Sequence, residues 1–358
     1  MNLPYRGAID CDIHPALPGT QALLPYLDGY WHDTVTMVMK GIGRLELNSY
    51  PPNAPLSSRP DWRPRAGKAG ADLALLRQHV LDRFGVRHAI CNCLSGVHAI
   101  HNPDLGAALC RALNDWIAKE WLDREPRLRA SIVISLMNPE AAVDEIERLA
   151  SDRRFVQVLV LAMGEMPLGR RVYWPIYRAA ERHGLPIGIH AGSMMRHAPT
   201  QSGYPSYLAE DYVTQAQGFA TQTISLVAEG VLTKYPGTRI VLIESGVSWL
   251  PGLMWRLSKD WRGVRTEIPW VKAVPADVIR EHFRLTIQPL DAPPGREAVK
   301  RLLDHIGSDE MLLFATDYPH WQFDGDEALP PGLPDGLLPK IMVDNPLATY
   351  SRLKETAL

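Results

Sequence analysis

Short, nearly continuous apolar runs recur along the chain and alternate with stretches in which apolar residues follow a helical spacing. A run such as residues 155–161 (Phe-Val-Gln-Val-Leu-Val-Leu) is typical of a strand that is buried on both faces in a parallel sheet. The strands predicted in this way cover residues 9–14, 87–93, 129–135, 155–161, 186–190, 239–244, 283–288 and 311–317.

Helical segments are predicted between and after these strands. Over residues 71–84, for example, Leu73, Leu76 and Val80 lie at helical spacing. The predicted helices cover residues 71–84, 105–120, 139–151, 173–183, 217–235, 252–261, 297–306 and 345–354. Alternating strands and helices of this number favour an α/β fold of the closed (β/α)8 type, a TIM barrel, over an open sheet. Because no Gly-rich phosphate-binding motif follows a strand, a dinucleotide-binding fold is disfavoured.

Residues 15–70 interrupt the alternation. Pro and Gly recur there, as in residues 51–55 (Pro-Pro-Asn-Ala-Pro), so we expect a long, irregular, loop-rich insertion after the first strand. Its cations could hold an anionic substrate or form a solvated surface; they are Arg59, Arg63, Arg65 and Lys68. We expect residues 1–358 to form one domain that ends in a closing helix within residues 345–358.

Composition and charge then exclude several classes of protein. With 46% hydrophobic residues and a net charge of -2, the chain is typical of a globular protein and offers no electrostatic case for binding nucleic acid or an anionic membrane. No apolar run reaches the roughly 18 residues of a transmembrane helix, and the first residues lack the apolar segment of a signal peptide. We therefore expect a cytoplasmic protein whose four cysteines are reduced thiols.

Potential metal ligands follow the ends of four predicted strands. In a (β/α)8 barrel, the C-terminal strand ends surround the active site. The candidates on the first, fifth, sixth and eighth strands are Asp12, His14, His190, Glu244, Asp317 and His320. Alternation along the first strand places Asp10 on the same face, one layer deeper, where we expect it either to support the ligands or to have a structural role.

Each candidate alone is also compatible with a structural role, as a hydrogen-bonded histidine or a turn-capping aspartate. Together they favour a metal centre, because buried charges are costly unless they are paired or bind a metal. Carboxylates and imidazoles without a thiolate suit Zn, Mn or Fe(II). Such an ion activates a bound water molecule or polarises a substrate oxygen.

The chain resembles the amidohydrolase superfamily, and within it the amidohydrolase-related group that includes aminocarboxymuconate semialdehyde decarboxylase and the γ-resorcylate-type decarboxylases. The motifs that carry the resemblance are Ile9-Asp10-Cys11-Asp12-Ile13-His14, Gly188-Ile189-His190-Ala191-Gly192, Val241-Leu242-Ile243-Glu244-Ser245-Gly246 and Phe314-Ala315-Thr316-Asp317-Tyr318-Pro319-His320.

The resemblance implies a role for each matching position. Asp12 and His14 correspond to the strand-one ligand pair, in which a carboxylate replaces the first histidine in some decarboxylases. His190 corresponds to the strand-five ligand, and Asp317 to the strand-eight carboxylate that binds metal and moves a proton. Glu244 stands where the decarboxylases typically have a histidine, so it is a second candidate for proton transfer. His320 is either a further ligand and catalytic residue or a residue that orients Asp317.

We therefore expect a metal-dependent hydrolase or non-oxidative decarboxylase that acts on a small carboxylate-bearing or cyclic compound through a metal-activated water. The alternative is a dinuclear Fe or Fe/Mn oxygenase, since Asp12, Glu244 and His320 could help to hold a second ion. A non-catalytic subunit is a third hypothesis. We expect a homo-oligomer or an assembly with a related subunit. Loop residues that could line the pocket are His98, His101, Trp174, Arg196, His197, Trp249, Gln288 and Trp321.

Overall fold

Eight parallel strands form the centre of the molecule. The computed structural model describes residues 6–41, 57–97, 100–192, 197–320 and 329–354. The strands pair in chain order, from β1 to β8. They are β1 (Ile9–Ile13), β2 (His88–Cys91), β3 (Leu128–Val133), β4 (Phe155–Leu161), β5 (Ile187–His190), β6 (Ile240–Ile243), β7 (Phe283–Thr286) and β8 (Leu312–Leu313). The (β/α)8 fold predicted from the alternation of apolar runs is thus confirmed, and each strand lies within its predicted run or one residue outside it.

The barrel closes between β1 and the segment that follows β8. The Cys11 amide donates to the Phe314 carbonyl at 2.9 Å, and the Asp317 amide donates to the Asp12 carbonyl at 3.1 Å. The buried Asp10 carboxylate strengthens this seam, because it accepts hydrogen bonds from the Thr316 amide at 3.0 Å and the Thr316 hydroxyl at 2.6 Å. The structural role predicted for Asp10 agrees with these contacts.

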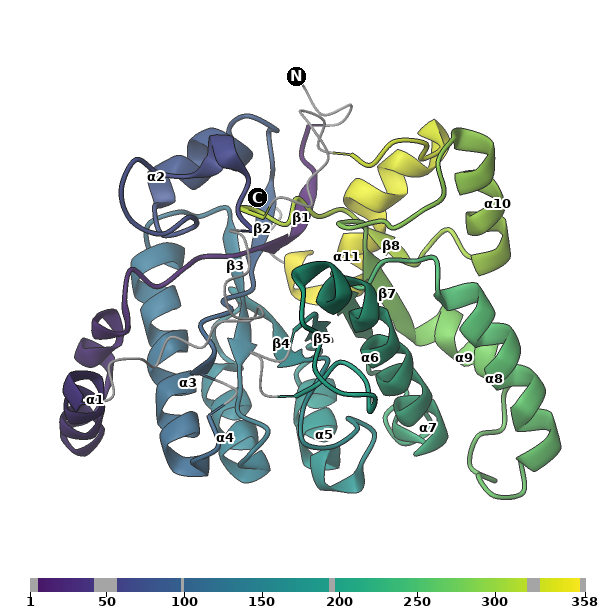
Figure 1. The fold of residues 1–358 in the computed structure, drawn as a ribbon, viewed down its shortest axis with the longest axis horizontal. Coiled ribbons are helices and arrows are strands. Elements are labelled where there is room, and N and C mark those ends of the chain that lie inside the picture. Colours follow the sequence, from purple (N-terminus) through teal and green to yellow (C-terminus); the bar gives the residue numbers. More distant parts are fainter. Residues whose placement is uncertain (1–5, 42–56, 98–99, 193–196, 321–328, 355–358) are drawn as a thin grey trace.

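Helices surround the strands, and α1 lies at the outer edge of the molecule, beyond α3 (Figure 1). The helices are α1 (Gly29–Gly41), α2 (Leu73–Leu76), α3 (Pro103–Ile117), α4 (Pro139–Leu149), α5 (Trp174–Arg182), α6 (Leu208–Ala228), α7 (Val231–Lys234), α8 (Leu250–Val264), α9 (Pro275–His282), α10 (Arg296–Ile306) and α11 (Asn345–Thr349). Of these, none is both long and apolar enough to cross a membrane, a finding that holds for the described residues.

The expectation that residues 15–70 are irregular is wrong in part. Helix α1 and the 3-10 turns Thr20–Tyr26 and Pro60–Trp62 lie within this stretch. Proline explains the difference, since it interrupts helices locally and residues 29–41 contain none. The Pro-rich residues 51–55 on which the expectation rested lie outside the described residues.

Several predicted helix boundaries also differ from the structure, including those of the helices predicted at 217–235 and 345–354. Helix α6 begins nine residues before the predicted start at 217, because the Glu210 side chain accepts hydrogen bonds from the Ser206 and Tyr207 amides and caps the first turn. The predicted helix 217–235 divides at Gly230, which has a left-handed φ of 82°. The predicted helix 345–354 ends at Thr349 and is followed by a 3-10 turn.

Candidate metal centre

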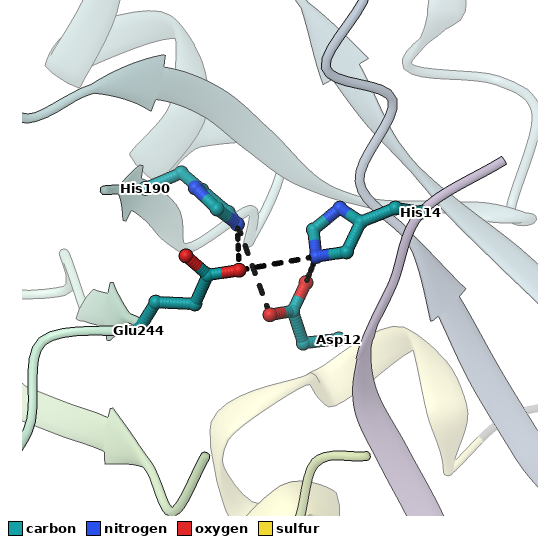
Figure 2. A group of neighbouring side chains, drawn as sticks. All are labelled: Asp12, His14, His190 and Glu244. Atoms are coloured by element: carbon teal, nitrogen blue, oxygen red, sulfur yellow. Dashed lines mark ion pairs between the residues drawn. The ribbon is translucent and has the colours of Figure 1, made fainter. Parts of the chain in front are cut away.

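The six predicted ligands come together at the C-terminal mouth of the barrel. They form two overlapping groups, within each of which the potential ligand atoms lie no more than 4.8 Å apart. The first group is Asp12, His14, His190 and Glu244, and the second is His14, Glu244, Asp317 and His320. Figure 2 shows the four side chains of the first group pointing toward one another from the C-terminal ends of β1, β5 and β6.

His14 lies between the carboxylates. Its Nε2 atom is 3.0 Å from Asp317 Oδ1, 3.3 Å from Asp12 Oδ1 and 3.4 Å from Glu244 Oε1. Across the site, His190 Nε2 is 3.4 Å from the same Glu244 oxygen. His320 Nδ1 lies 2.5 Å from Asp317 Oδ1 and 3.3 Å from Glu244 Oε1. Glu244 therefore joins the two groups.

Backbone carbonyls fix the orientation of two imidazole rings. His14 Nδ1 lies 2.9 Å from the Asn92 carbonyl oxygen, and His190 Nδ1 lies 2.9 Å from the Ala191 carbonyl oxygen. A carbonyl can only accept, so each Nδ1 carries the proton. The Nε2 lone pair of each ring is then available to a metal ion.

The chemistry of the cluster fits a bound cation. Four of its buried polar atoms have no hydrogen-bond partner among the described residues; they are Asp12 Oδ2, His190 Nε2, Glu244 Oε1 and Asp317 Oδ2. Leaving such atoms without a partner is costly in a protein interior. Oxygen and imidazole nitrogen are the donors that Zn, Mn and Fe(II) accept, so one ion would satisfy several of these atoms together.

Electrostatics in the cluster lead to the same conclusion. Burial favours neutral imidazoles, but the neighbouring carboxylates raise the pKa of both His14 and His190 above the usual value. The carboxylates thus favour positive charge at the Nε2 atoms, a charge that a divalent ion can supply. Burial and the negative charge of Glu244 raise the pKa of Asp317 to about 6. The carboxylates therefore differ in how readily they hold a proton.

Two of the site residues have an unusual backbone conformation. Glu244 and Asp317 have φ values of 60° and 55°, in the left-handed region that residues other than glycine adopt at a cost. Local hydrogen bonds hold them there: the Glu244 amide donates to Thr286 Oγ1 at 3.0 Å, and the His320 amide donates to the Asp317 carbonyl at 2.7 Å. Strained residues of this kind concentrate at functional sites.

Sequence reasoning did not single out Asn92, which directly follows β2. Besides accepting from His14 through its carbonyl, Asn92 donates from Nδ2 to Asp12 Oδ1 at 2.8 Å. It is fully buried, so both contacts are shielded from water. The available signal was a polar side chain at a strand end beside β1, which alone does not distinguish a structural residue from one that positions ligands.

The loop residues proposed to line the pocket have mixed outcomes. His101 and His197 both lie near Glu165, at 3.3 and 3.9 Å, and contribute to a small cavity between the ends of β3 and β4. Trp174 and Trp249 donate to backbone carbonyls of their own loops, as expected of structural residues. Gln288 is buried. The remaining candidates, His98, Arg196 and Trp321, lie outside the described residues.

Comparisons with known proteins identify relatives of the chain. The family described as Amidohydrolase matches residues 9–352. The γ-resorcylate decarboxylase of Rhodococcus jostii is 28% identical over 268 residues, which cover 69% of this chain and 78% of that protein.

Solved structures share the fold over nearly the whole chain. An amidohydrolase from Mycobacterium avium subsp. paratuberculosis has a TM-score of 0.71 at 21% identity, covering 97% of this chain and all of that one. A dihydroxybenzoic acid decarboxylase from Polaromonas, solved with manganese and the inhibitor 2-nitroresorcinol, has a TM-score of 0.69 at 21% identity and covers 99% of this chain and 100% of that chain.

Proposed function

Because this chain belongs to the amidohydrolase family, as its match over residues 9–352 shows, we propose that it is a metal-dependent decarboxylase of a small aromatic or related cyclic carboxylate. The observation that carries the proposal is the convergence of six ligand-type side chains with buried, unpartnered donor atoms at the barrel mouth. The γ-resorcylate decarboxylases among the relatives support this reaction and substrate class.

One divalent ion would be held by the first group of ligands, Asp12, His14, His190 and Glu244. Asp317 and His320 belong to the second group, which shares His14 and Glu244 with the first and is the place where a second ion would bind. We propose manganese, zinc or iron(II) on the basis of the donor set. When bound, such an ion polarises a substrate oxygen and stabilises negative charge on it.

The residues of the chain must supply a proton. In a non-oxidative decarboxylation, the carbon–carbon bond to the carboxylate breaks, CO2 leaves, and the bonding electron pair takes up a proton at the ring carbon. His320 Nδ1 contacts both Asp317 and Glu244, and His320 also lines the cavity beside the cluster. We therefore assign His320 to carrying the proton between these carboxylates and the substrate.

Substitution of His190 tests the metal assignment. We expect His190→Ala to lose both the stoichiometric metal and the activity, because it removes an imidazole that backbone contact holds in ligand orientation. Elemental analysis would give the metal content, and release of CO2 from γ-resorcylate would give the activity. His305→Ala, on the surface of α10, is the matched control and should leave both unchanged. Full metal content in His190→Ala would contradict the assignment.

Hydrolysis is the alternative reaction on the same side chains, with a carboxylate removing a proton from water. Product analysis separates the two reactions, since a decarboxylase releases CO2 whereas a hydrolase incorporates water into its products. The dinuclear oxygenase receives no support from the relatives described above. Oxygen uptake together with about two iron ions per chain would be needed to support the oxygenase hypothesis.

We also propose that the protein acts in the cytoplasm as a single-domain subunit of a homo-oligomer. Light scattering would give the oligomeric state, and limited proteolysis would report whether the chain resists cleavage as one unit.

A further inference from the structure

A cavity of about 210 Å³ opens beside the proposed metal centre. His14 and His320 form the wall nearest the cluster, and apolar side chains form most of the rest. The other lining residues are Pro15, Ala16, Leu17, Thr20, Lys68, Ala69, Leu94, Ser95 and Pro319. A small, largely apolar chamber with a few polar groups is typical of a site for a small molecule.

The segment that carries Lys68 is held against the backbone of His14. The Ala16 amide donates to the Gly70 carbonyl at 3.0 Å. Gly70 has a φ of 80°, and a Cβ atom at this position would collide with the His14 carbonyl oxygen. Only glycine therefore permits this close approach, and Lys68, two residues earlier in the same segment, lines the cavity.

Two polar residues that line the cavity are suited to an anion. The Ser95 hydroxyl is buried and has no hydrogen-bond partner among the described residues. Lys68 is exposed to solvent at the cavity, and it has the only permanent positive charge among the described lining residues. A carboxylate can accept hydrogen bonds from both a hydroxyl and an ammonium group, and this cavity is lined by one of each.

The carboxylates of the metal centre favour a separate cation for an anionic ligand. The cluster contains the carboxylates of Asp12, Glu244 and Asp317. A single divalent ion would offset only two of these three negative charges when all three groups are ionised. Lys68 supplies a positive charge elsewhere in the same cavity, and this charge would attract a carboxylate.

We propose that Lys68 and the Ser95 hydroxyl form an anion-binding subsite that holds the carboxylate of a small cyclic acid in front of His14 and His320. This inference rests on the proposed function only in taking that acid as the substrate. The subsite itself concerns binding, and it can be tested without turnover.

The test compares benzoate with its neutral isostere benzamide, each titrated into the manganese-loaded enzyme by calorimetry. We expect the wild type to bind benzoate more tightly than benzamide and to lose this preference at high salt. Lys68→Met should weaken benzoate binding about tenfold and leave benzamide binding unchanged, because it removes one charge-assisted hydrogen bond. Lys68→Arg should retain the preference, and Lys259→Met, on the surface of α8, should behave like the wild type.

Ser95→Ala provides a second variant within the subsite and should weaken benzoate binding by a smaller factor than Lys68→Met. Equal wild-type affinity for the two probes, absence of benzoate binding, or an unchanged preference in Lys68→Met would overturn the subsite. Turnover is measured separately, as CO2 released from γ-resorcylate. A Lys68-dependent preference without CO2 release would contradict the proposed function and retain the subsite, whereas CO2 release with an unchanged preference in Lys68→Met would do the reverse.

Discussion

Asn92 positions two proposed ligands at once. Its backbone carbonyl accepts a hydrogen bond from His14 Nδ1, and its side-chain amide donates one to Asp12 Oδ1. The other Asp12 oxygen, Oδ2, has no hydrogen-bond partner among the described residues and lies 3.8 Å from His190 Nε2. Asn92 is itself fixed, because its Oδ1 accepts from the Ser131 hydroxyl at 2.6 Å. Contacts of this kind set the direction and the basicity of metal ligands.

Replacing Asn92 should weaken metal binding without removing a ligand. We expect Asn92→Ala to lower manganese affinity about 10- to 100-fold, since Asp12 loses the donor that orients it. Competition with a chelator would measure the dissociation constant. Asn138→Ala, which removes the N-cap of α4, is the matched control: it should cost about 1 kcal/mol of stability and leave metal affinity unchanged. Equal affinity in wild type and Asn92→Ala would show that Asp12 needs no such support.

At the scale of elements, the strands were more predictable than the helices. A strand that is buried on both faces, such as β4, can be recognised from the sequence. Because both of its faces contact apolar side chains, its residues form a nearly continuous apolar run. Helix α1 and helix α9 were missed, since α1 lies in a stretch rich in proline and glycine, and α9 is short and begins at a proline. The end of α11 at Thr349 was not predictable, because it depends on a contact that Tyr350 makes in the barrel interior.

The residues of the candidate site also differ in how well the sequence predicts them. His14 and His190 could be chosen from the sequence because imidazoles at barrel strand ends have a restricted set of roles. Asn92 and Ser95 could not be chosen in this way, because their importance follows from the atoms that the fold places next to them. The local sequence pattern thus predicts the elements and the types of candidate ligand. The residues that support those ligands can be found only once the fold shows which side chains are neighbours.

An ion-pair network joins the helical turn before β2 to the start of β3. The buried Glu125 carboxylate accepts from Arg77 Nε at 2.7 Å and from Arg127 Nε at 2.8 Å. Arg127 also pairs with Asp82, at 2.8 Å. The hydrogen bonds from Arg127 and Arg77 outweigh the effect of burial and lower the pKa of Glu125 to about 2.

Neutralising this carboxylate should destabilise the fold. We expect Glu125→Gln to lower the free energy of unfolding by about 1–2 kcal/mol at pH 7, because charge-assisted hydrogen bonds to partly exposed arginines are lost. The folded-state pKa is depressed, so the contribution is complete above the ordinary glutamate pKa and disappears as the pH falls toward about 2. The difference in melting temperature between variant and wild type should therefore shrink below about pH 4.5. Glu267→Gln, an exposed control, should show little change at any pH, and a constant difference from pH 7 to 3 in Glu125→Gln would exclude this ionisation.

At the scale of the whole molecule, a buried hydrogen bond attaches the C-terminal segment to the barrel strand β4. The buried Tyr350 hydroxyl donates to Gln157 Oε1 at 3.0 Å. Gln157 Nε2 in turn donates to Ser131 Oγ at 2.9 Å and lies 3.2 Å from Asn92 Oδ1. A continuous chain of buried hydrogen bonds thus connects the end of the sequence to the residue that supports Asp12.

Tyr350→Phe tests how much the hydrogen bond from Tyr350 to Gln157 contributes to the stability of the fold. We expect a loss of about 1–2 kcal/mol in stability, because Gln157 Oε1 becomes a buried acceptor without its donor. Thermal unfolding would measure the change, with the exposed Tyr30→Phe as the control. An unaltered melting temperature in Tyr350→Phe would indicate that another group satisfies Gln157.

The left-handed backbone of Glu244 and Asp317 has a consequence for how this protein can evolve. Each position costs roughly 1–2 kcal/mol in a residue with a side chain, and glycine would relieve that cost. Selection for thermal stability alone would therefore favour glycine at these two positions. The candidate metal centre would then lose two of its carboxylates. Selection for stability and selection for the proposed metal centre therefore act in opposite directions at these two positions, so a library selected for stability alone should be enriched in stable variants that lack these proposed ligands.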